Sequence, residues 1–79
     1  MAENMRPHRD FGRRIKAARA LCGLTAIELA EKTEIKISMI RQYEHGRCLP
    51  SIERLYKIAT ALDVTTDYLV GTREKEGVR

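Results

Sequence analysis

Two short amphipathic helical patterns, joined by a tight turn between residues 24 and 50, constrain this chain more than any other feature. Thr25 and Glu28 have the T-x-x-E spacing of a capping box, in which each side chain accepts a hydrogen bond from the other residue's backbone N–H. This spacing predicts a helix that begins at about Ala26, and we expect it to end near Lys32 or Thr33. The residues expected to face inward are Ile27, Leu29 and Ala30. After a turn over residues 33–36 a second helix is expected at 37–44, and so short a connection makes the two helices cross at a steep angle.

The helix over residues 37–44 has two faces of different chemistry. Successive residues lie about 100° apart around a helix axis. Met39, Ile40 and Tyr43 therefore share the sector expected to face the core, with Glu44 at its margin. The opposite sector carries Ile37, Ser38, Arg41, Gln42 and His45. Because that face offers hydroxyl, guanidinium, amide and aliphatic groups together, we interpret the segment as the recognition helix of a helix-turn-helix DNA-binding motif.

Three further helices are expected around this pair. Asp10 should cap a helix over residues 11–22, which Gly23 ends because glycine adopts a left-handed conformation without steric cost. Its core-facing residues are predicted to be Phe11, Ile15, Ala18 and either Leu21 or Cys22. Ser51 should cap a helix over residues 52–62. Its buried stripe is predicted to be Ile52, Leu55, Ala59 and Leu62, with Tyr56 and Ile58 at the edges. Thr65 should cap a short last helix, closed by Gly71, whose Tyr68 and Leu69 pack on the bundle.

Length and composition predict one small all-helical domain. The chain has 79 residues, 43% of them hydrophobic and none of them tryptophan, so one core is just sufficient and no second domain is expected. We expect the domain to span residues 10–71. Residues 1–9 are predicted to be a flexible arm, and residues 72–79 a flexible charged tail.

The net charge of +4 lies entirely in the first part of the chain. Residues 1–50 hold ten basic and six acidic groups, and residues 51–79 hold five of each. Several arginines gather between Arg6 and Arg19. Such a cluster attracts polyanions such as nucleic acid, although a solvated helix face would explain it equally well on its own.

The remaining chemistry excludes several classes of function. Cys22 and Cys48 lack metal-ligand spacing, and His8 and His45 lie apart from them, so we expect no metal. No nucleophile lies beside a base and no glycine-rich phosphate loop is present, so we expect neither an enzyme nor a cofactor nor a small-molecule substrate. The N-terminus is polar, and no apolar run approaches the roughly 20 residues of a membrane span. We therefore expect a cytoplasmic protein with free thiols and no membrane partner.

Residues 24–35 and 38–71 together resemble a known family. They read L-T-x-x-E-L-A-E-K-T-x-I and S-x-I-x-x-Y-E-x-G-x-x-x-P-S-x-x-x-L-x-x-I-A-x-A-L-x-V-x-x-D-Y-L-x-G, a pattern similar to the Cro/repressor-type (Xre-like) helix-turn-helix family. The resemblance covers about residues 11–71. It implies a five-helix, lambda-repressor-like DNA-binding domain whose second and third helices form the motif. It also implies a homodimeric transcriptional repressor of bacterial or phage type, which reads the major groove with its third helix and is associated with the nucleoid.

The resemblance implies roles for individual residues. The family's base-reading positions fall on Ile37, Ser38 and Gln42, with Lys36 and Arg41 beside them. Gln42 can bind adenine through two hydrogen bonds, Ile37 can pack on a thymine methyl group, and Arg41 can reach guanine or a phosphate. The family's phosphate contacts fall on Thr25, His45, Gly46 and Arg47, and Arg13 and Arg14 are weaker candidates. For each residue the alternative is an exposed side chain without a role.

The resemblance also implies an ion pair between Arg19 and Glu44. Three positions depart from the family pattern: Ala26 replaces a frequent glutamine, Glu34 a common glycine, and Lys36 a serine or threonine cap. Glu34 must adopt a left-handed conformation or reshape the turn. Since lysine cannot accept the hydrogen bonds of a cap, the helix after Lys36 is expected to begin at residue 37 or one to two residues away.

The sequence also suggests a surface for dimerisation and leaves one competing function open. The candidate dimer surface comprises Tyr56, Val64 and Leu49, which would otherwise complete the core. The competing hypothesis is an antitoxin-like or bridging module whose helices dock on another protein. The recognition face is polar for a protein-binding groove, and this favours DNA.

Overall fold

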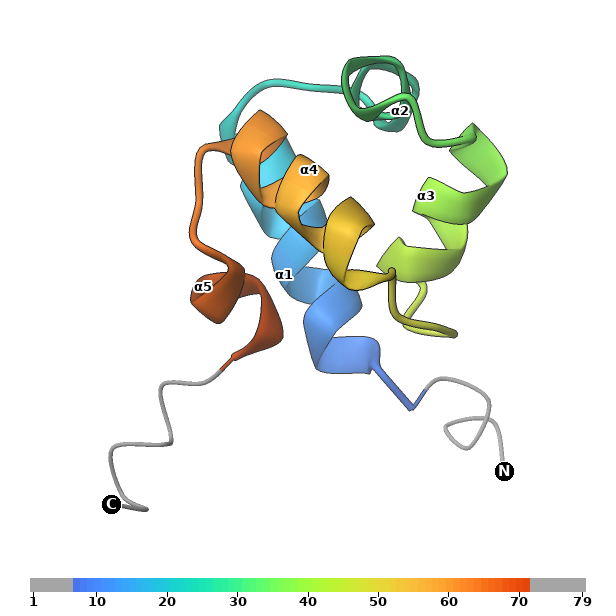
Figure 1. Cartoon of the computed structure of the whole chain (residues 1–79), viewed down its shortest axis with the longest axis vertical. Helices are drawn as coiled ribbons and strands as arrows, with labels where there is room; N and C mark the ends of the chain where they lie inside the picture. The colour runs from blue at the N-terminus through green and yellow to red at the C-terminus, as the bar shows by residue number, and fades with distance from the viewer. Residues whose placement is uncertain (1–6, 72–79) are drawn as a thin grey trace.

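The computed structural model describes residues 7–71, which form five α-helices and, within that range, no strand (Figure 1). The helices are α1 (Arg9–Leu21), α2 (Ala26–Thr33), α3 (Ile37–Glu44), α4 (Ile52–Leu62) and α5 (Thr66–Val70). Helix α1 contacts α3 and α5, α2 contacts α3 and α4, and α4 contacts α5. The helices thus form a closed ring of contacts, which confirms the predicted five-helix class. The predicted tail and the first six residues of the predicted arm lie outside the described residues.

Every helix contributes side chains to a single core. The buried hydrophobic residues are Phe11, Ile15, Ala18, Leu29, Ala30, Ile35, Ile40, Tyr43, Ile58, Ala59, Leu62 and Leu69. Ile35 belongs to the turn between α2 and α3, where the sequence pattern assigned no core residue. Because this side chain is buried, the turn is tied to the core as firmly as the helices beside it.

Helices α2, α4 and α5 begin at the predicted caps. Thr25 Oγ1 accepts a hydrogen bond from Glu28 N at 3.0 Å, and Glu28 Oε1 accepts one from Thr25 N at 2.8 Å. Ser51 and Thr65 accept hydrogen bonds in the same way from the N–H three residues ahead, at 3.2 and 3.0 Å. These local signals set the starts of the first helix of the motif and of the two helices that follow it.

The start of α1 differs from the prediction. The helix begins at Arg9, and Asp10 lies in its first turn instead of capping it. His8 occupies the N-cap position, where its N–H donates to Gly46 O at 2.9 Å. This hydrogen bond joins the start of α1 to the loop after α3, and no local signal in the sequence encodes that contact.

Several residues predicted to be buried lie at the surface. Leu21 is 87% exposed, Ile27 54% and Ile52 70%, and each lies in the first or last turn of its helix. Cys22 is also exposed, although its thiol donates to Leu62 O at 3.3 Å. Periodicity predicts which residues share a face, but not how far along the helix that face is covered. Ile58, predicted at an edge, is fully buried for the same reason.

Candidate nucleic-acid interface

The end of α3 is anchored to α1 by an ion pair. Arg19 Nε and Nη2 donate to the two carboxylate oxygens of Glu44 at 2.6 and 3.2 Å, and Arg19 Nη1 donates to Leu24 O at 2.8 Å. The side chains of Arg19 and Glu44 are 16% and 8% exposed. The predicted pair is confirmed. Two parallel hydrogen bonds fix direction as well as distance, so the pair orients α3 on α1.

Helices α1 and α3 also meet at backbone contact. A Cβ atom on Gly12 would lie 2.7 Å from Tyr43 O and closer still to Glu44 O. Real Cβ atoms do not approach backbone oxygens so closely, and Gly12 is therefore the residue that lets α3 lie against α1. The sequence pattern did not single out this glycine, because its requirement comes from a helix distant in the chain.

The turn before α3 contains a non-glycine residue, Glu34, in a left-handed backbone conformation. Glu34 has φ 60° and ψ 31°, so of the two expected alternatives the structure shows the left-handed conformation. Lys36 lies at the N-cap position of α3, where its carbonyl accepts hydrogen bonds from Met39 N at 2.9 Å and Ile40 N at 3.1 Å. Helix α3 begins at Ile37, so the missing side-chain cap does not shift its register.

The outward side of α3 carries the five residues predicted to contact bases. Lys36, Ser38 and Arg41 are exposed, and Ile37 and Gln42 are half-buried. Ile40 and Tyr43 are buried on the opposite side. Ile37 also packs against the edge of the core, so it is not the fully exposed side chain that the alternative reading assumed. Its position is partly structural.

Of the four residues predicted to contact phosphates, three are exposed and one, Gly46, is buried. His45 and Arg47 are exposed, as is Thr25 at the start of α2. Gly46 has φ +76° and is buried, and its N–H donates to Tyr43 O at 3.0 Å. A Cβ atom there would lie 2.7 Å from Arg9 Cα. Gly46 thus lets the loop lie against α1, while the side chains of His45 and Arg47 on either side of it are exposed.

The backbone of one arginine lies at this loop, and the side chains of two others contact residues elsewhere. Arg9, assigned to the flexible arm by its sequence, lies against Gly46. Arg13 pairs with Asp10 at 3.5 Å, and Arg14 lies 6.0 Å from the centre of the Tyr68 ring in α5. The arginine cluster in the sequence was the one signal that could have indicated Arg9.

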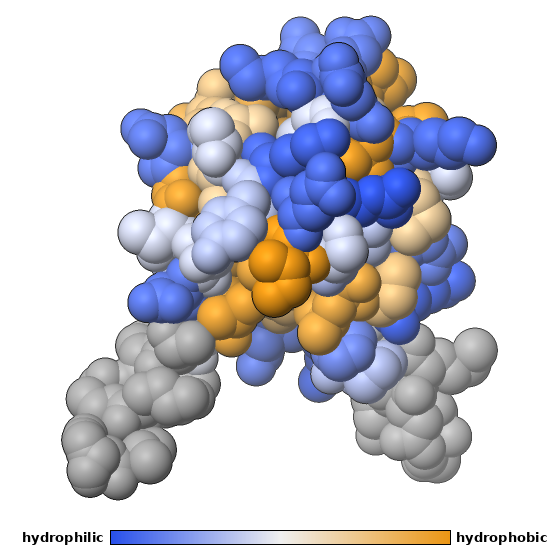
Figure 2. Space-filling view, in the orientation of Figure 1, coloured by the Kyte–Doolittle hydropathy of each residue, from blue (hydrophilic) through white to orange (hydrophobic). Residues whose placement is uncertain are grey.

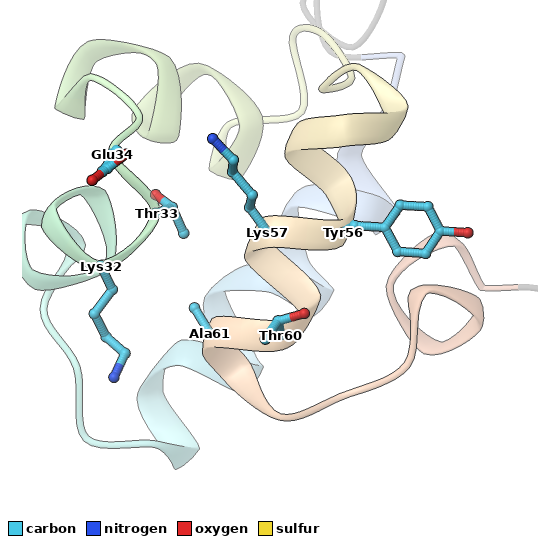
Figure 3. A pocket seen from close by; sticks show the side chains of 7 residues that line it. All are labelled: Lys32, Thr33, Glu34, Tyr56, Lys57, Thr60 and Ala61. Atoms are coloured by element: carbon cyan, nitrogen blue, oxygen red, sulfur yellow. The ribbon is translucent and has the colours of Figure 1, made fainter.

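A hollow of about 620 Å³ lies between the end of α2 and the outer face of α4 (Figure 3). Its lining side chains diverge: Tyr56 points away from Lys32 and Glu34, so no set of polar groups converges on a ligand. Within residues 7–71, no three His, Cys, Asp or Glu side chains are grouped to hold a metal. None of the described helices is long and apolar enough to span a bilayer.

Comparison with known proteins finds similarity to helix-turn-helix proteins. The helix-turn-helix family model matches residues 15–69. The chain is 38% identical over 65 residues to the HTH-type transcriptional regulator ImmR of Bacillus subtilis, covering 82% of this chain and 51% of ImmR. It is 34% identical over 58 residues to the cryptic phage CTXphi transcriptional repressor RstR of Vibrio cholerae, covering 73% and 52%. The immunity repressor protein of Bacillus phage phi105 is 38% identical over 60 residues, covering 76% and 42%.

The chain spans about half the length of these relatives. A crystal structure of nearly its own extent is similar too. It is the restriction-modification controller protein C.AhdI from Aeromonas hydrophila, with a TM-score of 0.75 and 30% identity, covering 80% of this chain and 96% of that one. The names of the relatives are those of regulators and repressors, which agrees with the expectation that the chain is not an enzyme.

Proposed function

The chain belongs to the helix-turn-helix family, whose model matches residues 15–69, and we propose that it is a transcriptional regulator that binds double-stranded DNA sequence-specifically. The observation that carries the proposal is α3. Its inner side is buried by Ile40 and Tyr43, its end is fixed by Glu44, and its outer side exposes hydrogen-bonding groups. A rigid helix with such a face suits the major groove. The names of ImmR, RstR and the phi105 protein support regulation, and two of the three support repression.

In this proposal the contacts divide by chemistry. The residues that reach base edges are Lys36, Ile37, Ser38, Arg41 and Gln42. Gln42 binds adenine, and Arg41 binds guanine or a phosphate. The side chains of Thr25, His45 and Arg47 contact phosphates on either side, joined by Arg9, and Gly46 shapes the loop. Phosphate contacts position such a protein, whereas base contacts carry its specificity.

The proposed regulator acts as a homodimer through apolar side chains near the start of α4. Ile52 is 70% exposed, Tyr56 60%, Leu49 50% and Val70 45%, and Leu49 and Val70 line one hollow. Figure 2 shows apolar surface gathered on the lower half of the drawn face, between α5 and the start of α4. Val64, part of the predicted surface, is half-buried and packs on the core. Closed two-fold pairing would cover this surface.

Selection of duplexes from a random pool tests the proposal directly. Binding by a homodimer should enrich a short inverted repeat, and affinity should fall steeply with salt because each neutralised phosphate releases counterions. A pool without sequence preference after repeated rounds would reject sequence-specific regulation. A protein acting in this way would work in the cytoplasm of a bacterial or phage-infected cell, on the nucleoid.

A further inference from the structure

One large apolar side chain beside the recognition face has no role in the core. Ile27, in the first turn of α2, is 54% exposed. It lines a shallow hollow together with Ile37, the first residue of α3, and Ile35, which is 3% exposed. Three isoleucines, from α2, the turn and α3, thus line one apolar depression. The sequence pattern did not predict this depression.

We propose that this depression receives the 5-methyl group of a thymine, and that Ile27 is a specificity-determining residue. The inference rests on the proposed DNA-binding function, since it assigns a base to one edge of that interface. Ile37 belongs both to the hollow and to the outward side of α3. A base read by the first turn of α3 therefore lies beside Ile27 as well.

The charges around the hollow favour a base edge over the DNA backbone. Glu31 and Glu34 line it from α2 and the turn, and Lys36 lines it at the start of α3. Two exposed carboxylates repel phosphates, so a phosphate is not the group that enters. In the major groove the apolar group of a base is the thymine methyl, and an isoleucine-lined depression matches it in polarity.

The expected contribution follows from the area that one methyl group buries. Removing a single buried methyl or methylene group from such a contact costs about fourfold in affinity. Deoxyuridine differs from thymidine by that methyl alone and keeps every hydrogen-bonding group. Replacing each thymine of the selected operator in turn with deoxyuridine therefore isolates the contact.

The test compares the parent protein with Ile27→Ala and Ile37→Ala on this series of duplexes. The parent should lose about fourfold at one thymine position in each half-site. Ile27→Ala should bind the thymine and deoxyuridine duplexes equally at that position, and Ile37→Ala should weaken the same methyl effect. Leu21→Ala is the matched control, because Leu21 is 87% exposed in the last turn of α1, outside the proposed dimer surface, and the variant should keep the full effect.

The possible outcomes distinguish failure of the thymine-methyl site from failure of the proposed DNA-binding function. If the parent selects no duplex sequence, the proposed function fails. If it binds a specific operator but loses nothing at any thymine, or if Ile27→Ala keeps the parent's full loss, the methyl site is rejected while sequence-specific binding stands. Circular dichroism of each variant shows that it is folded, which is expected because Ile27 lies at the surface.

Discussion

The guanidinium of Arg19 donates two hydrogen bonds to the carboxylate of Glu44, at 2.6 and 3.2 Å, and so joins the last turn of α1 to the last residue of α3. The same guanidinium donates to Leu24 O, just before α2. One side chain therefore ties together α1 and both ends of the helix-turn-helix unit. The orientation of the recognition helix depends on a residue that contacts no DNA in the proposed complex.

Removing Glu44 should destabilise the fold. Glu44→Ala leaves a largely buried guanidinium without its carboxylate, and we expect a loss of about 1–3 kcal/mol in the free energy of unfolding. Urea denaturation followed by circular dichroism measures it. Asp10→Ala is the control, because its pair with Arg13 has side chains 81% and 74% exposed and should contribute less than about 1 kcal/mol. Equal losses in the two variants would show that the buried pair contributes no more to the free energy of unfolding than the exposed pair does.

Gly12→Ala should destabilise the domain although alanine favours helices. A helix-interior glycine replaced by alanine normally gains about 1 kcal/mol. Here the new Cβ would lie 2.7 Å from Tyr43 O, and overpacking of this kind costs about 1–3 kcal/mol. Thermal melts should show a lower Tm, and operator affinity should fall because α3 must shift. A raised Tm would mean that the two helices are not in backbone contact.

Glu34→Gly should stabilise the domain. A non-glycine residue in the left-handed region costs about 1–2 kcal/mol, and glycine relieves it at a smaller entropic cost, so we expect a net gain of about 1 kcal/mol. Glu31→Gly makes the same change of charge within α2 and should instead lose about 1 kcal/mol. Opposite shifts in Tm for the two variants confirm the strain at φ 60°. A loss at both positions would argue that Glu34 stabilises the turn in another way.

Gln42 and Arg47 should affect DNA binding differently. Gln42→Ala is expected to lose discrimination at one base position, a loss of about 1–3 kcal/mol for the preferred base. Arg47→Ala should weaken all duplexes alike and reduce the magnitude of the salt slope by about 0.9, the value of one phosphate contact. Titrations on the operator and its single-base variants, repeated at several salt concentrations, measure both quantities. A sequence-selective loss for Arg47→Ala would reverse the two assignments.

Ile52→Lys should weaken self-association. The side chain is 70% exposed in the single chain, so the change should not unfold the domain, but a lysine in an apolar interface would be desolvated at a cost. Sedimentation velocity should show a shift from dimer to monomer. Leu21→Lys, at an 87% exposed position in the last turn of α1, is the matched control and should leave the dimer intact. The same sedimentation for both variants and the parent would remove Ile52 from the interface.

Local chemistry made much of the fold predictable from the sequence. The capping residues Thr25, Ser51 and Thr65 act on N–H groups three residues away, so they mark the starts of their helices without reference to the rest of the chain. Periodicity likewise separated the buried Ile40 and Tyr43 from the outward residues of α3. The Arg19–Glu44 pair came from family resemblance, because no local pattern links residues so far apart.

Tertiary structure decided whatever depends on residues distant in the chain. The loop at Gly46 is hydrogen-bonded to the residue before α1, and Gly12 is required because α3 packs on α1. Ile27 and Ile52, in the first turns of α2 and α4, remain exposed although periodicity places them on the core-facing side. The sequence by itself determined the helices, the turn and the polar face of α3, because hydrogen bonding and side-chain spacing within a few residues encode them. Which surfaces are covered, and which residues stand beside that face, was decided only when the helices packed, since burial is a property of neighbours and not of a segment.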